Sequence, residues 1–259
     1  MKPLLLLYSY KFVKNPLNIV FSVLWPIAWI IISYFAWGRG FQEGINGFSG
    51  NANFFIFTAP GYFLMAATSI SLANVPNTIA ADRIYNRVKI FRTLNINRTQ
   101  YIFTHCIVNF SVFLFVFLVQ LLISNFAFEL NLSASTFFSI FFLDLFAFIL
   151  MLFLALFLSQ FGKTDRSINL IGTVVFYPIL FLSGNSIPAF SIDPNGVWFK
   201  YVQFLEPVGG AAYFSQNIIL QDTFGFSQID WKVDWLGIII PVAEAVIFGL
   251  ITWKIFKWK

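Results

Sequence analysis

The sequence has few charged residues, one cysteine and one histidine. Only 10% of its 259 residues are charged, whereas ordinary globular domains carry roughly 25%, so a soluble fold is excluded. A single cysteine, Cys106, excludes an intrachain disulfide and a cysteine-ligated metal cluster. A single histidine, His105, excludes a His-rich zinc site.

Residues that would perform catalysis are missing as well. The sequence shows no paired carboxylates, no Ser-His-Asp set and no Gly-rich phosphate cradle. Gly162-Lys163-Thr164 resembles part of a phosphate loop, but Phe157 stands where that motif needs another glycine, and no strand precedes it. We therefore expect no catalytic residue and no bound metal in this chain.

What the sequence does contain is long apolar runs: 59% of the residues are hydrophobic and 20% are aromatic. About 20 apolar residues suffice for one helix to cross a bilayer, and six runs are long enough. A bilayer offers no hydrogen-bond partners to the backbone, so each run is predicted to be a helix. The strict alternation of a membrane β-barrel is absent. We expect an all-α polytopic membrane protein, a single domain over 1–259, with spans near 17–37, 54–76, 101–125, 134–160, 167–187 and 235–253.

The orientation follows from lysine and arginine, which concentrate in cytoplasmic loops. With the N-terminus inside, all of the 16 basic residues except Arg39, Lys200 and Lys232 lie on the inner side. The sequence therefore predicts a multi-pass protein with both termini in the cytoplasm, and the basic pI reflects this topology rather than nucleic-acid binding. We expect no cleavable signal peptide.

Two segments outside the spans have a distinctive composition. Residues 1–16 are apolar with three lysines and end at Asn15-Pro16, which favours a helix lying in the inner headgroup layer over a cytoplasmic extension of the first span. The outer segment 188–234 is divided by Glu206-Pro207 into two aromatic halves, each too short to span. It is interpreted as a re-entrant helical hairpin buried against protein, or else as a folded external cap.

The segment 77–100 is the most strongly charged part of the chain. It holds five basic residues against one acid, Asp82. On the cytoplasmic side it would be accessible to a soluble partner, and we expect Arg83, Arg87 and Arg92 to contact that partner. The alternative is a solvated loop whose charges only set the topology.

Several polar residues lie within the apolar runs: Ser71 and Asn74 in the second, Asp144 in the fourth and Glu244 in the sixth. Intramembrane acids cost about 2.5–3.5 kcal/mol on insertion scales and usually face the bundle interior. They would belong to a translocation pathway or a coupling element, or they would be protonated and hydrogen-bonded to a neighbouring helix; a third alternative for Asp144 is a position near the outer interface. Ser71 and Asn74 would line the pathway or serve close helix packing.

This pattern resembles the ABC-2 type permeases, the six-helix membrane subunits of type V ABC exporters. The resemblance covers the whole chain and rests on two signatures besides the topology. The segment from Asp82-Arg83 to Arg98 looks like the family's coupling-helix loop, although many members have Glu where Asp82 stands. Ser183-Gly184 with Pro188 is similar to the family's SG-x-x-x-P segment, and the outer hairpin has an atypical acid in Glu206-Pro207.

The resemblance implies the permease subunit of an ATP-driven exporter in the plasma membrane, moving a drug, peptide antibiotic or lipid-like substrate by alternating access. Its partners would be two copies of an ABC ATPase, a second permease subunit, identical or paralogous, and membrane lipid. ATP and Mg would bind to the partner ATPase and no cofactor to this chain. The ATPase-docking residues would be Asp82, Arg83, Tyr85, Arg87 and Arg92.

Three other hypotheses remain. An ABC exporter of lipid-linked polysaccharide would share the fold. A secondary transporter would run on an ion gradient, with Asp144 and Glu244 as coupling groups. A membrane-embedded enzyme would need clustered acid, His or Ser residues, whereas Asp144, Glu244 and His105 are scattered along their spans.

Overall fold

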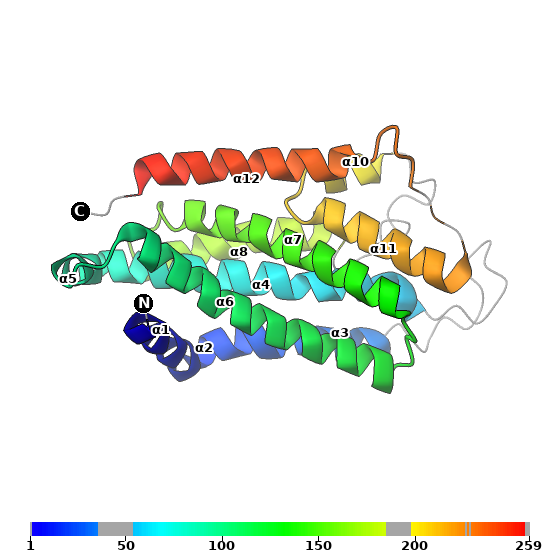
Figure 1. Ribbon diagram of the computed structural model, residues 1–259, viewed down its shortest axis with the longest axis horizontal. Helices are drawn as coiled ribbons and strands as arrows, with labels where there is room; N and C mark the ends of the chain where they lie inside the picture. The colour runs from blue at the N-terminus through cyan, green and yellow to red at the C-terminus, as the bar shows by residue number, and fades with distance from the viewer. Residues whose placement is uncertain (1, 36–53, 185–197, 226, 228, 257–259) are drawn as a thin grey trace.

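The structure is a helical bundle. The computed structural model describes residues 2–35, 54–184, 198–225, 227 and 229–256, and all regular structure among them is helical (Figure 1). The predicted all-α fold class is thus confirmed. Of the predicted elements, the ends of the first and fifth spans (36–37 and 185–187) and the start of the outer segment (188–197, with Pro188) lie outside the described residues.

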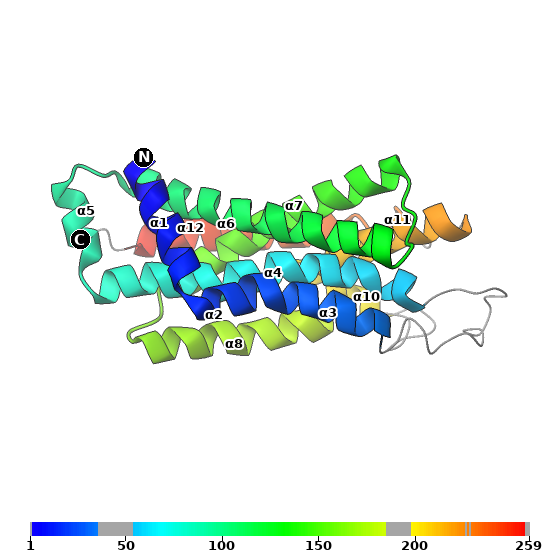
Figure 2. The same ribbon diagram turned by 90° about the horizontal axis from the view of Figure 1, so that it is seen from below.

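The N-terminal helix lies across the end of the bundle. Helix α1 (Lys2–Lys14) buries Leu4, Tyr8 and Phe12, one residue per turn, and packs this face on α6 (Figure 2). Asn15 ends it and starts the next helix, because the Asn15 side chain accepts a hydrogen bond from the Leu17 N–H. The boundary predicted at Asn15-Pro16 is therefore where the chain turns.

The first predicted span is one continuous helical stretch made of α2 (Pro16–Ile19), a π-helical segment η1 (Val20–Leu24) and α3 (Trp25–Ser33). Gln120 of α6 fastens it to α4. Its side-chain amide donates to the Pro26 carbonyl at 3.1 Å and to the Tyr62 carbonyl at 2.9 Å. Gln120 is itself fully buried, so this amide joins three helices inside the bundle.

Helix α4 (Phe54–Ile84) is 31 residues long and continues past the predicted end of the second span. Pro76 lies inside it and cannot donate to the carbonyl four residues earlier. Nearby side chains bond to the backbone of the same stretch: Asn77 donates to the Ala73 carbonyl at 2.6 Å and Thr78 to the Asn74 carbonyl at 2.8 Å. The first third of the predicted 77–100 loop is thus helical.

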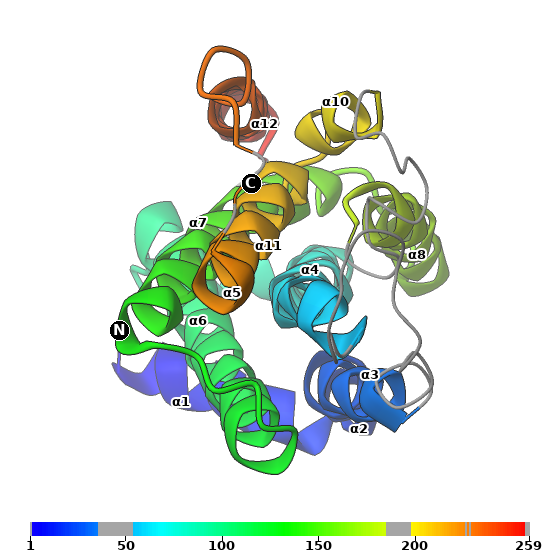
Figure 3. The ribbon, with the colours of Figure 1, turned by 90° about the vertical axis from the view of Figure 1, so that its right-hand side faces the viewer.

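Helix α4 is the centre of the bundle, surrounded by α3, α6 (Arg98–Leu122), α7 (Ala134–Leu158), α8 (Asp165–Leu182) and α11 (Gly209–Phe224) (Figure 3). Its fully buried side chains include Tyr62, Phe63, Leu64 and Met65. Helix α6 continues as a second π-helical segment, η3 (Ile123–Ala127), and α12 (Leu236–Ile255) packs on α7.

The predicted outer segment contains two helices, α10 (Phe199–Phe204) and α11, on either side of residues 205–208. Asp234, just before α12, fixes them in place. This fully buried carboxylate accepts from Lys200 at 3.1 Å and from the Tyr213 hydroxyl at 2.7 Å. Glycines allow close approach, since a Cβ at Gly210 would lie 1.8 Å from the carbonyl oxygen of Gly237 on α12.

Four stretches are long and apolar enough to cross a membrane: Pro16–Ser33, Arg98–Ala127, Ala134–Leu158 and Leu236–Ile255. The other two predicted runs form α4, which carries many buried Ser, Thr and Asn side chains, and the shorter apolar helix α8. The start of α1, the end of α12 and α5 (Arg87–Thr93) lie together at one end of the bundle (Figure 1).

Candidate functional site

Asparagines shape the connection between α4 and α6. Asn86 and Asn95 have positive φ angles of 57° and 55°, a conformation that asparagine adopts more readily than most residues. They turn the chain before and after the short helix α5. Asn97 then precedes α6, and its backbone N–H donates to the Gln100 side chain at 3.2 Å. The result is a short helix held across the end of the bundle.

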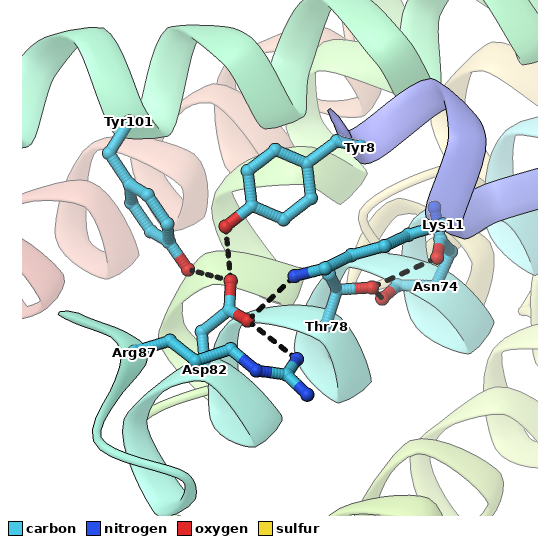
Figure 4. Close-up of polar contacts among 7 residues, drawn as sticks. All are labelled: Tyr8, Lys11, Asn74, Thr78, Asp82, Arg87 and Tyr101. Atoms are coloured by element: carbon cyan, nitrogen blue, oxygen red, sulfur yellow. Dashed lines mark hydrogen bonds and ion pairs between the residues drawn. The ribbon is translucent and has the colours of Figure 1, made fainter. Parts of the chain in front are cut away.

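Five side chains, which we call the Asp82 cluster, meet next to this helix: Tyr8, Lys11, Asp82, Arg87 and Tyr101 (Figure 4). One Asp82 oxygen accepts hydrogen bonds from the hydroxyls of Tyr8 and, at 3.2 Å, Tyr101. The other pairs with Lys11 at 3.2 Å and Arg87 at 3.1 Å. A carboxylate accepts about four hydrogen bonds, so the fully buried Asp82 has its hydrogen-bonding capacity filled.

The cluster joins α1, the end of α4, the start of α5 and the start of α6. Burial, followed by the negative charge of Asp82 and its hydrogen bond, raises the pKa of Tyr8 well above its ordinary value. Tyr8 therefore stays a neutral hydroxyl that donates to Asp82. All four elements therefore meet at this one carboxylate, which bonds α5 to α1 and α6 through a single buried group.

The structure separates the predicted docking residues into inward-facing and outward-facing ones. Asp82 is fully buried, and Arg83 turns inward to donate to the carbonyls of Gln160, at 3.0 Å, and Gly162. Burial lowers the pKa of Arg83 from its ordinary value. Arg87 is half-exposed and pairs with Asp82. Only Tyr85, which is 55% exposed, and Arg92 face outward.

Outward-facing apolar residues of α5 and its end were missed by sequence reasoning. Val88 and Phe91 are buried, whereas Ile90 is 57% and Leu94 is 64% exposed. Lys89 is exposed beside them. The signal was available as three apolar residues in a short basic helix with a fourth, Leu94, directly after it, too many for one buried face.

The intramembrane polar residues do not gather in one place. Asn74 accepts from the Asn18 amide at 2.9 Å and donates to Asn109, which joins α2, α4 and α6. The buried Ser71 hydroxyl and both oxygens of Asp144 have no hydrogen-bond partner among the described residues. Glu244, on α12, is partly buried.

In the segment predicted as the outer hairpin, Ser183 and Glu206 are connected through Gln203. The Ser183 carbonyl accepts from the Gln203 side chain at 3.0 Å, and the Glu206 N–H donates to the Gln203 carbonyl. Gly184 has a φ of 79°, which favours glycine, and Pro207 is buried. Burial and then the nearby Glu244 carboxylate raise the pKa of Glu206 to about 7.

A cavity of about 700 Å³ lies beside the Asp82 cluster, between the first span, α4 and α8. Its size is within the range of small-molecule sites, roughly 300–1,000 Å³. Neither Ser71, Asn74, Asp144 nor Glu244 lines it. Small or polar residues recurring every three or four positions could have indicated it: Ser69, Ala73, Asn77 and Ala81 on α4, and Asn169, Gly172 and Thr173 on α8.

Within the described part of the chain, no three His, Cys, Asp or Glu residues are grouped as metal ligands.

The protein is a membrane-embedded helical bundle. Its helices include long apolar ones, and the Asp82 cluster and α5 lie at one end of it. Residues 7–215 match the family described as ABC-2 type transporter, and the chain belongs to that family. It is therefore a permease component of an ABC transporter, and such permeases generally work with an ATPase partner. Comparison with curated proteins and with solved structures gave no match.

Proposed function

We propose that the chain is the permease subunit of an ATP-driven exporter and that α5 is its docking element for the ATPase. The observation that carries this proposal is the outer face of α5, where exposed Ile90 and Leu94 stand beside the exposed bases Lys89 and Arg92. Apolar contacts surrounded by charges are typical of a protein interface. Tyr85, also exposed, continues this face toward α4.

Asp82, Arg83 and Arg87 contribute to docking indirectly. Their side chains bond to α1, to α6 and to the turn between α7 and α8. A push on α5 thus moves several helices as a unit, as a rigid-body transition between inward-open and outward-open states requires. ATP and Mg bind to the partner, which closes and supplies the push.

The complete exporter contains two ATPases and a second permease subunit, identical or paralogous. It resides in the plasma membrane, where all six predicted runs span the bilayer and the end bearing α5 and both termini faces the cytoplasm. The helices α10 and α11 enter from the outside as a re-entrant hairpin. The packing of α11 on α4, α7 and α12 supports this placement, since a helix at membrane depth that does not span must be buried against protein.

The cargo is amphipathic or apolar, such as a drug, a peptide antibiotic or a lipid-like molecule. The cavity between the first span, α4 and α8 supports this, because aromatic and aliphatic side chains form much of its wall alongside amides and hydroxyls.

The test is co-purification. This chain, carrying an affinity tag, is co-expressed with each ABC ATPase chain of its organism and purified in a mild detergent. We expect one ATPase to co-purify with the wild type and to be lost from the double variant Ile90→Asp/Leu94→Asp. Arg92→Glu should weaken the complex, and Lys232→Glu, the same charge reversal at an exposed site outside the proposed docking face, should not.

The chain must remain monodisperse in gel filtration for a loss to count. If the wild type binds none of the ATPases, the exporter proposal fails. If the ATPase binds equally well to wild type and to the double variant, docking lies elsewhere than α5.

A further inference from the structure

We propose that the cavity beside the Asp82 cluster binds an amphiphile with an acidic head group, a phosphate or a carboxylate. That this amphiphile is the transported cargo rests on the proposed function; that it binds does not. The inference follows from the two cationic side chains that line the cavity and from the apolar side chains of the rest of its wall.

Two cationic side chains line the cavity, Lys11 from α1 and Arg87 from α5. No acidic side chain is among the described residues that line it. Their common partner Asp82, bonded to both in Figure 4, does not line it and is fully buried. Two cations against one carboxylate leave one positive charge uncompensated at this wall.

Both cations also keep hydrogen-bond donors beyond those given to Asp82. An ammonium has three donors and a guanidinium five, whereas Lys11 gives one hydrogen bond to Asp82 and Arg87 gives one through Nη1. Hydrogen bonds from ionised donors to a phosphate or a carboxylate are shorter and stronger than neutral ones. An acidic head group would therefore gain both a charge partner and hydrogen bonds there.

The rest of the wall suits an apolar tail. Leu17, Phe21 and Trp25 line it from the first span, and Phe176 and Tyr177 line it from α8. Leu17, Phe21 and Tyr177 are 64%, 47% and 49% exposed, so a bound tail would replace lipid or detergent against these side chains and would gain close van der Waals packing there.

A row of amides and hydroxyls runs along the same cavity. Asn18, Asn77 and Thr78 contribute from the first span and α4, and Asn169 and Thr173 contribute from α8. These neutral groups accept and donate hydrogen bonds without favouring either charge. The preference for an acidic head thus rests on Lys11 and Arg87 alone.

The test uses the purified chain in non-ionic detergent, with bound molecules counted by native mass spectrometry. The probes are oleoyl lysophosphatidate, which has an acidic head, oleoyl lysophosphatidylcholine, which is zwitterionic, and oleylamine, which is cationic. We expect lysophosphatidate to bind roughly tenfold more tightly than either of the others. Inorganic phosphate, the head group alone, should displace it only weakly, because the tail contributes binding.

Removing Lys11 or Arg87 would leave Asp82 with fewer partners and could unfold this end of the bundle, so the decisive variant is elsewhere. Asn169→Asp adds one negative charge to the α8 wall of the cavity, where Asn169 is exposed. It should weaken lysophosphatidate binding roughly tenfold and leave lysophosphatidylcholine unaffected. Asn131→Asp, the same change at an exposed position that does not line the cavity, should alter neither.

Equal binding of the three oleoyl probes, or a preference for oleylamine, would overturn the inference. So would an equal effect of Asn169→Asp and Asn131→Asp, because the acidic amphiphile would then bind outside this cavity. Neither result touches ATPase co-purification through α5, so the inference can fail while the exporter proposal stands.

Discussion

The hydroxyl of Tyr8 donates a hydrogen bond to Asp82, which lies 74 positions further along the chain. This bond connects the N-terminal helix to the end of the central helix α4. Lys11 adds an ion pair between the same two helices. One carboxylate thus connects the N-terminal helix to α4 through polar contacts. Changes to Asp82 should therefore alter the stability of the protein.

Asp82→Asn should lower the melting temperature of the purified chain. The change leaves Lys11 and Arg87 without their carboxylate, and because both cations are partly exposed we expect a loss of about 1–3 kcal/mol. Differential scanning fluorimetry measures it. Tyr8→Phe, which removes one donor and keeps the ring, should cost less than Asp82→Asn; a larger cost for Tyr8→Phe would contradict the assigned hydrogen bonds.

Gly210→Ala should separate α11 from α12. The new Cβ would lie 1.8 Å from the Gly237 carbonyl oxygen, so backbone has to move, and we expect a loss of about 3 kcal/mol. Gly249→Ala is the control, since its Cβ would meet only ring atoms of Phe153 at 3.1 Å. Thermal unfolding of both variants should show a clear loss for Gly210→Ala alone, and similar melting temperatures would rule out the close helix contact.

Stability should fall as pH rises through the range in which Glu206 ionises. The unfolded chain releases this proton near the ordinary pKa of 4.5, whereas burial and Glu244 raise the folded pKa to about 7. Between these values the folded state holds the extra proton, so ionisation opposes folding as pH increases. Glu206→Gln should reduce the fall of the melting temperature between about pH 4.5 and 7, and an unchanged pH profile would argue against a raised pKa of Glu206.

Asp144→Leu should raise the melting temperature. Asp144 is fully buried in α7, and neither carboxyl oxygen has a hydrogen-bond partner in the described part of the chain. Unsatisfied buried polar groups cost about 1–3 kcal/mol, and leucine has the same number of side-chain heavy atoms, branched at the same position, without polar atoms. Reconstituted transport by the same variant is the companion measurement: a stabilised but inactive protein would assign Asp144 to function, as the sequence hypothesis of a pathway residue expects.

The sequence by itself determined that the protein is helical and which family it belongs to. Its apolar runs predict helices wherever the structure describes them, because an apolar environment forces the backbone to bond within itself. The sequence predicts an interruption at Asn15-Pro16; in the structure α1 ends at Lys14 and α2 begins at Pro16, since proline favours the first turn of a helix. The charged segment 77–100 contains α5 and the buried Asp82. The order of segments indicated the family, which the match over residues 7–215 shows.

Only the tertiary structure decided which of those charges face outward. From sequence, Arg83, Arg87 and Arg92 were equivalent, yet Arg83 bonds to a turn 77 or more positions away and only Arg92 is exposed. Likewise Asn74 was a pathway candidate, whereas the cavity wall comes from Asn18, Asn77 and Asn169 on three segments. Local composition determines whether a residue is helical. Its side-chain partners depend on which distant helices pack against it, and only the tertiary structure shows that.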